Sequence, residues 1–248
     1  MKARFGEAWE RLFDPPVAHR GLWSPDGPPE NSLGAFQAAC ASGYGVELDV
    51  QLSADGEAMV FHDDTLERMT GAQGRLCDWA AEDLAELRLK GTDERIPTLV
   101  EALTEIGRRA LVQVELKTPY GAVGPLERRV HDIIIDHAGP VALIGFNPYS
   151  HAWFAERFPG VLRGLDSYGY GDAPQLAEEQ RGVFARLEHV EIARPHFLAL
   201  GLDMLPGEAA ARHRAKGLPV IAWTVRSPDQ WVAVQDACDN FIFDGFIP

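Results

Sequence analysis

The sequence has few cysteines, and their arrangement excludes two kinds of protein. Cys40, Cys77 and Cys238 are odd in number, far apart and free of CxxC spacing. A disulfide-stabilised scaffold needs paired cysteines, and a structural zinc site needs closely spaced ligands. We therefore interpret the three residues as small apolar side chains in a reducing compartment.

Long apolar segments are also missing. No window approaches the roughly 18 apolar residues that a bilayer-spanning helix needs, so no transmembrane segment is predicted. Residues 1–16 mix charges of both signs with aromatic residues and contain no continuous apolar core, which is not the pattern of a signal peptide. We expect a cytoplasmic protein.

Basic stretches are absent as well. The formal net charge is −14, and no stripe of Lys and Arg is present. Because a nucleic-acid backbone is bound by a basic face, the composition excludes a nucleic-acid partner. An acidic surface chiefly aids solubility, and an anionic substrate needs locally placed Arg, Lys or metal to overcome it. Nothing in the sequence indicates an oligomeric state.

The order of strand-like and helix-like segments predicts the fold class. A chain of 248 residues suits one domain over residues 1–248, and strand-like and helix-like segments alternate along it. This favours a parallel α/β fold and, at this length, a (β/α)8 TIM barrel. A doubly wound open sheet is the alternative, but no G-x-G-x-x-G turn follows a strand. The expected strands are 17–21, 45–53, 109–117, 141–147, 161–165, 197–205, 219–225 and 241–246.

Two segments are expected outside the repeating pattern. The Asp55-Gly56 turn signal predicts that residues 59–63 fold back antiparallel on the second strand. We expect this hairpin and a helix over 80–89 to form a small insertion at about residues 50–95. A short amphipathic helix over 5–13 is expected across one end of the fold.

Carboxylates alternate along the second expected strand. Glu47 and Asp49 share one face, and the apolar residues between them share the other. In an ordinary half-buried strand the polar face meets water, whereas in a barrel the inner face carries a site near the strand's end. Glu115 ends the third strand in the same way. Three converging carboxylates repel unless a cation neutralises them, so they predict Mg²⁺ or Ca²⁺, or a raised pKa.

Histidines and cations stand beside these carboxylates. His19 and His62 end strands and titrate near neutral pH, so they suit general acid–base work, with buried core histidines as the alternative. Arg20 and Lys117 suit a phosphate oxygen. Alternatively, Arg20 forms a structural ion pair and Lys117 is a solvent-exposed charge. Together with a metal, these residues predict a phosphoryl-transfer site without a P-loop.

The order of the motifs adds a resemblance. AHRG, PENS, GVELDVQLSADG, VFHDDTLERMTGAQG and VELK follow one another over residues 17–117, and WTV lies near the C-terminus. This pattern resembles the glycerophosphodiester phosphodiesterase family. The resemblance implies a TIM barrel with a small segment inserted after the second strand. It also implies metal-dependent hydrolysis of small glycerophosphodiesters to sn-glycerol 3-phosphate and an alcohol.

The same resemblance implies a set of site residues. They are the acid–base pair His19 and His62, the metal ligands Glu47, Asp49 and Glu115, the phosphate contacts Arg20 and Lys117, the supporting Glu30 and Asn31, and Trp223 as a wall on the glycerol side. From its mid-strand position alone, Trp223 is expected in the core. The loop 21–28 and the Asn147-Pro148 pair depart from the family's pattern.

Three functions remain open at this point. The first is the glycerophosphodiester phosphodiesterase, with water or the glycerol 2-hydroxyl as the nucleophile. The second is a lysophospholipase D-like enzyme, which needs an apolar acyl channel for which region 166–205, with Tyr168, Tyr170 and Phe197, is the candidate. The third is a barrel that binds phosphodiesters without catalysis, which a missing histidine or carboxylate would favour.

Overall fold

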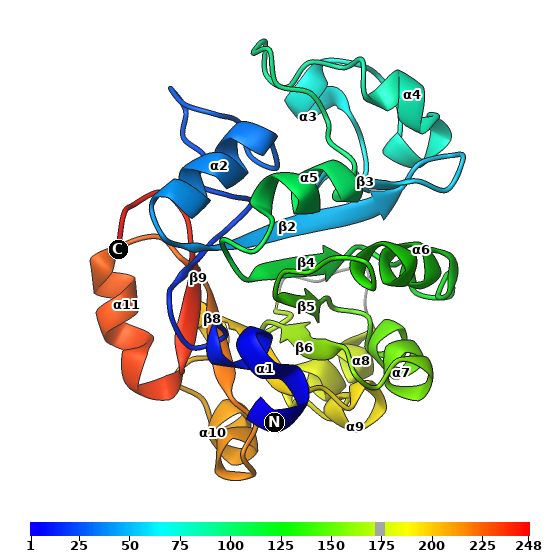
Figure 1. The fold of residues 1–248 in the computed structure, drawn as a ribbon. Coiled ribbons are helices and arrows are strands. Elements are labelled where there is room, and N and C mark those ends of the chain that lie inside the picture. The colour runs from blue at the N-terminus through cyan, green and yellow to red at the C-terminus, as the bar shows by residue number, and fades with distance from the viewer. Residues whose placement is uncertain (172–176) are drawn as a thin grey trace.

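Eight parallel strands close into a barrel in the computed structural model, which describes residues 1–171 and 177–248. The barrel closes because β1 pairs with both β2 and β9, and it confirms the predicted (β/α)8 fold (Figure 1). The barrel strands are β1 (Val17–Ala18), β2 (Gly45–Leu52), β4 (Val112–Leu116), β5 (Val141–Ile144), β6 (Leu162–Ser167), β7 (Phe197–Gly201), β8 (Val220–Val225) and β9 (Asn240–Phe243).

Helices surround the barrel because the outward faces of the strands are apolar. Val46, Leu48 and Val50 of β2 lie in one buried cluster with Phe36 of α2 and Leu103 of α5. The alternate residues of β2 therefore point into the barrel, as predicted. The covering helices are α2 (Leu33–Ala41), α5 (Leu99–Ile106), α6 (Pro125–Ile134), α7 (Pro148–Arg157), α8 (Glu178–Ala185), α9 (Val190–Ala193), α10 (Glu208–Ala215) and α11 (Pro228–Val234).

The amino ends of the strands are sealed by the first helix. Ala8 and Leu12 pack against inward-facing apolar residues of the barrel, among them Phe197 and Ile221. This confirms the expected covering helix. Its bounds differ, because α1 spans Lys2–Glu10 and has a non-helical backbone at Gly6. Catalytic groups are therefore confined to the opposite, carboxyl end of the barrel.

The predicted insertion forms a small hydrophobic unit beside β2. Strand β3 (Ala58–Val60) pairs antiparallel with β2 across a turn at Gly56, whose φ of 86° suits glycine. The predicted helix over 80–89 is wrong in length, because α4 spans only Ala81–Leu84. The Leu89 N–H instead donates to the Glu94 carbonyl, and the resulting turn buries Leu89 in the insertion's own cluster. The insertion also contains α3 (Glu67–Thr70).

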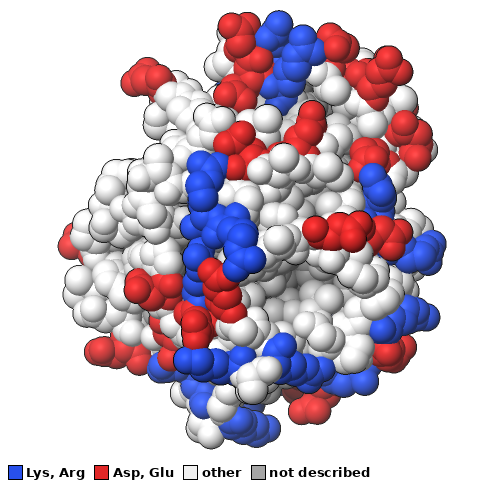
Figure 2. Space-filling model, in the orientation of Figure 1, with Lys and Arg blue, Asp and Glu red and all other residues white. Residues whose placement is uncertain are grey.

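The surface carries charge of both signs. On the face drawn in Figure 2, Lys and Arg side chains form a column left of the centre and a row across the lower part, and acidic side chains lie beside them. The surface therefore has local basic regions despite its negative net charge, and an anionic substrate requires such regions. Within the described residues, no helix is both long and apolar enough to cross a membrane.

Buried histidines on the outer layer predict loss of stability in acid. Burial lowers the pKa of both His151 and His189 to about 4. Since their unfolded pKa is near 6.5, the unfolded chain binds more protons below that value. The stabilisation that comes from keeping each histidine neutral is therefore fully present above about pH 6.5 and is lost as the pH falls toward 4. Between pH 7 and pH 5, the free energy of unfolding decreases by ~2 kcal/mol per histidine.

The variant His189→Leu tests this effect, because neither ring nitrogen of His189 has a hydrogen-bond partner among the described residues. We expect the free energy of unfolding in urea at pH 7 to be nearly that of the wild type. The decrease in this free energy between pH 7 and pH 5 should be smaller than in the wild type by ~2 kcal/mol. An unchanged pH difference would contradict the assignment.

Candidate active site

Three carboxylates meet inside the carboxyl end of the barrel. Glu47 and Asp49 point inward from β2, and Asp49 pairs in register with Glu115 of β4. All three are buried, and one oxygen from each lies within 4.8 Å of the others. The alternation of β2 and the parallel register with β4 bring the predicted cluster together.

The electrostatics of this cluster fit a divalent cation. Burial, together with the other two carboxylates, raises the pKa of Glu47, and burial and Asp49 raise the pKa of Glu115 to about 7. Burial also opposes ionisation of Asp49, but Lys117 and Arg20 outweigh it and lower the pKa of Asp49. Glu47 Oε1 and Asp49 Oδ1 are buried and accept no hydrogen bond from any residue in 1–171 or 177–248. Unpartnered carboxylate oxygens are the ligands that Mg²⁺ and Ca²⁺ prefer.

The two predicted cations lie against the carboxylates. Lys117 Nζ is 3.4 Å from Asp49 Oδ1 and 3.3 Å from Glu115 Oε1, so it is not a free solvent charge. Arg20 pairs with Glu30 at 2.9 Å and with Asp49 at 3.4 Å. The structural ion pair considered for Arg20 is thus present, and Arg20 nevertheless lines the same pocket as Lys117.

The backbone around Arg20 is also built into the site. Arg20 has a φ of 60°, in the left-handed region that costs a non-glycine residue about 1 kcal/mol or more. In this conformation its N–H donates to Glu47 Oε2 at 2.9 Å. Asn31, with a φ of 56°, donates from Nδ2 to Asp49 Oδ2 at 2.8 Å. The supporting role predicted for Asn31 therefore has a geometric basis, since it orients one carboxylate.

His19 is held by a residue from the far end of the chain. Its Nδ1 lies 3.0 Å from Asp244 Oδ2, just after β9, and its Nε2 lies 4.0 Å from Glu47 Oε2. Arg226 Nε approaches the other Asp244 oxygen at 3.1 Å. An ionised carboxylate only accepts hydrogen bonds, so Nδ1 carries the proton and Nε2 is directed toward the cluster.

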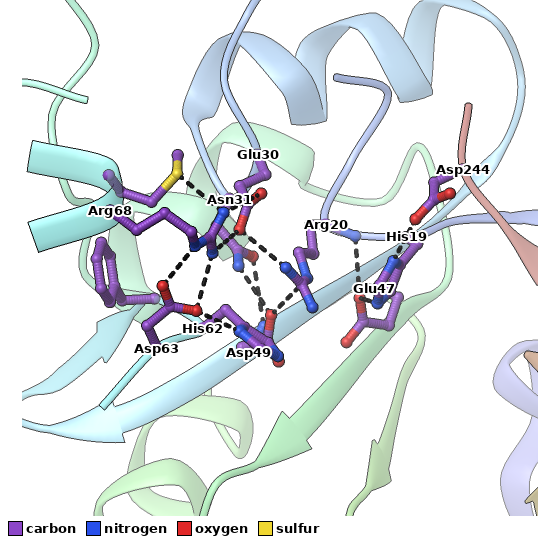
Figure 3. Close-up of polar contacts among 12 residues, drawn as sticks. His19, Arg20, Glu30, Asn31, Glu47, Asp49, His62, Asp63, Arg68 and Asp244 are labelled. Carbon is purple, nitrogen blue, oxygen red and sulfur yellow. Dashed lines mark hydrogen bonds and ion pairs between the residues drawn. The ribbon is translucent and has the colours of Figure 1, made fainter. Parts of the chain in front are cut away.

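His62 is held in the same way on the other side of the carboxylates (Figure 3). Its Nδ1 lies 2.7 Å from Asp63 Oδ1, and Arg68 of α3 donates to Asp63 and to Glu30. Glu30 thus joins Arg20 and Arg68. Burial, with Lys117 and Arg20, lowers the pKa of His62 despite the nearby Asp49. A neutral His62 can accept a proton.

A small pocket of about 180 Å³ lies in front of these groups. Its lining includes both histidines, Arg20, Lys117, Glu47 and Glu115, so the two histidines face a pocket and are not enclosed in the core. Phe146 and Trp223 form the apolar side, with ring centroids 5.6 Å apart. Trp223 is therefore half-buried at the pocket and not purely a core residue.

Several residues of the site had no assigned role in the sequence analysis. Asp244 directly follows β9, and Asp63 directly follows His62 in the segment after β3, and these positions are the signal that could have found them. Asp166 also lines the pocket, where burial and Glu115 raise its pKa. Gln51 Nε2 donates to the carbonyls of 61, 62 and 63 and so fixes the segment that carries His62, and no local pattern predicts such a contact.

The other predictions from the sequence concern the candidate acyl channel and Asn147, away from the carboxylate cluster. Phe197 is fully buried at the amino end of the barrel, so it is not part of an acyl channel. Residues 172–176 of the candidate channel region lie outside the described residues. Asn147 caps α7, because its side chain accepts from the Tyr149 N–H at 3.0 Å and donates to the Thr118 carbonyl at 3.2 Å.

A parallel barrel with buried carboxylates, two histidines and two cations at the carboxyl ends of its strands defines a barrel enzyme of phosphate-ester chemistry. Residues 19–136 match the model of the glycerophosphoryl diester phosphodiesterase family. A glycerophosphodiester phosphodiesterase of Caldanaerobacter subterraneus subsp. tengcongensis is 35% identical over 239 residues, which cover 92% of this chain and 93% of that protein. The chain therefore belongs to the glycerophosphodiester phosphodiesterase family, as its motifs predict.

Other relatives and solved structures match this chain over a shorter length or at lower sequence identity. Glycerophosphodiester phosphodiesterase 1 of Mus musculus is 45% identical over 104 residues, which cover 38% of this chain and only 31% of the mouse protein. The glycerophosphodiester phosphodiesterase structure from Thermotoga maritima is 27% identical with a TM-score of 0.71, covering 92% of this chain and 93% of that one. A phosphodiesterase from Oleispira antarctica, solved with its product sn-glycerol-3-phosphate, has the same fold with a TM-score of 0.81, 24% identity, and coverage of 96% and 95%.

Proposed function

We propose that this protein hydrolyses glycerophosphodiesters to sn-glycerol 3-phosphate and an alcohol, with a divalent metal and two histidines. The observation that carries the proposal is the convergence of His19, His62 and the Glu47, Asp49 and Glu115 carboxylates on one pocket. Family membership supports the reaction class. The relative from Caldanaerobacter, which this chain matches almost end to end, bears the name of that activity.

Glu47, Asp49 and Glu115 would hold the metal, Mg²⁺ or Ca²⁺, because three buried carboxylates with oxygens within 4.8 Å of one another form a hard-ligand set. A cation bound there supplies Lewis-acid stabilisation of the negative charge on the phosphate. Lys117 and Arg20 add donors on the same side of the pocket. These two cations bind and orient non-bridging phosphate oxygens.

The histidines transfer protons on either side of the reacting phosphorus. One histidine removes a proton from the nucleophile, which is water or the glycerol 2-hydroxyl, while the other protonates the departing alkoxide. Asp244 and Asp63 hold the Nδ1 atoms, which leaves each Nε2 available to the substrate. Trp223 and Phe146 wall the pocket and exclude water on the glycerol side.

We also propose that the whole chain works as one domain in the cytoplasm. The single-domain proposal is supported by the pairing of β1 with β9, which ties the two ends of the chain together. The location is supported by the three cysteines, which are all unpaired.

The test is release of sn-glycerol 3-phosphate from glycerophosphocholine and glycerophosphoethanolamine, with and without EDTA. We expect release that chelation abolishes and that Mg²⁺ or Ca²⁺ restores. Absence of sn-glycerol 3-phosphate with every metal would refute the proposed reaction, and would favour a barrel that only binds phosphodiesters. A parallel assay with lysophosphatidylcholine separates the lysophospholipase D-like alternative.

A further inference from the structure

A second, more open pocket adjoins the catalytic pocket. It has a volume of about 420 Å³ and shares Trp223, Thr224 and Arg226 with the catalytic pocket. Its other walls are Tyr168, which follows β6, and Gly201 to Asp203, at and just after the end of β7. A group attached to a phosphate in the catalytic pocket can therefore extend past Trp223 into this space.

The charge of the second pocket is set by Asp203. One carboxylate oxygen, Oδ2, accepts the Gly169 N–H at 2.8 Å, and the side chain forms no salt bridge within the described residues. The segment 172–176 contains no Lys or Arg that could supply one. The other charged residue, Arg226, is already paired with Asp244 at 3.1 Å. The pocket therefore has an uncompensated negative charge.

Aromatic rings form the apolar part of the same pocket. The rings of Tyr168 and Trp223 lie 6.5 Å apart at 68°, and Tyr170 stacks on Tyr168 at 3.9 Å and braces it. Burial, with a smaller effect from the nearby Asp203 carboxylate, raises the pKa of Tyr168. Ring faces beside an unpaired carboxylate attract organic cations, since the π-system and the charge act in the same direction.

We infer that this second pocket binds the leaving alcohol and selects alcohols that carry an ammonium group, with Asp203 as the residue that determines the preference. The inference rests on the proposed phosphodiesterase function. The phosphate and glycerol lie in the catalytic pocket, and the alcohol lies between Tyr168, Trp223 and Asp203. An alcohol with an added negative charge meets the Asp203 carboxylate and is disfavoured.

The experiment compares kcat/KM for glycerophosphoethanolamine, whose alcohol is cationic, with that for glycerophosphoglycerol, whose alcohol is neutral. We expect the wild-type protein to prefer the cationic substrate by about threefold to tenfold, the range of exposed ionic and cation–π contacts. Asp203→Asn keeps an acceptor for the Gly169 N–H and removes the charge. This variant is expected to bring the ratio to within about twofold of one, through a higher KM for glycerophosphoethanolamine.

The control is Asp236→Asn, which changes the net charge equally at an exposed residue near the amino end of β9. It is expected to leave the substrate ratio unchanged. Equal activity of the wild type on both substrates, or an equal loss on both in Asp203→Asn, would overturn the inference and leave the phosphodiesterase function intact. Failure of the wild type to hydrolyse either substrate would instead overturn the proposed function.

Discussion

Replacing His19 with alanine is expected to lower kcat for glycerophosphodiester hydrolysis by about 10²- to 10⁴-fold, the usual contribution of a positioned acid or base. The same range is expected for His62→Ala. The two histidines lie on opposite sides of the carboxylate cluster, each with its own aspartate. We therefore propose that each serves a different proton transfer, so the pH profile should lose one limb in each variant.

The control for this comparison is His137→Ala. His137 is half-buried after α6 and does not line the catalytic pocket. The activity of the His137→Ala variant should match that of the wild type. A loss of less than tenfold in either His19→Ala or His62→Ala, with the fold intact by circular dichroism, would remove that histidine from the mechanism.

Replacing Glu47 with glutamine is expected to remove most of the stabilisation that a divalent metal gives the fold. In the wild type, a cation at about 100 times its dissociation constant should stabilise the fold by ~2.7 kcal/mol and raise Tm by about 5–10 °C. In Glu47→Gln this rise should nearly disappear, because one of three ligands is lost. The metal-free variant should be at least as stable as the metal-free wild type, since a repelling buried charge is gone.

Glu86→Gln is the matched control, because Glu86 is exposed and, within the described part of the chain, pairs only with Arg95. Its Tm response to Mg²⁺ or Ca²⁺ should equal that of the wild type. A wild-type response that persists in Glu47→Gln, measured by differential scanning fluorimetry with and without EDTA, would place the metal elsewhere. This measurement is independent of activity.

Much of the fold and of the carboxylate cluster could be predicted from local patterns. The period-two alternation of residues 45–52 determines which side of β2 faces the helices, and a parallel barrel turns the other side inward. The Asp55-Gly56 turn likewise fixed the return of His62. The helix predicted over 80–89 failed because Leu89 is buried through a turn to Glu94, which the helical spacing of the leucines did not reveal.

The partner of His19 could not be derived from spacing. Asp244 reaches His19 across 225 residues only because β9 pairs with β1 when the barrel closes. The second pocket likewise depends on Tyr168 and Asp203, which follow β6 and β7, and on Trp223, which lies within β8. Sequence alone assigns each of these residues to the region of a strand. It does not show which ends are neighbours until the strand order is known.

The most direct test of the central claim is a crystal structure with Mn²⁺ and sn-glycerol 3-phosphate. We expect an anomalous peak bound by Glu47, Asp49 and Glu115. We also expect a phosphate whose oxygens lie within hydrogen-bonding distance of both His19 and His62, about 2.6–3.2 Å. A metal bound by other residues, or a phosphate outside the pocket between the two histidines, would contradict it.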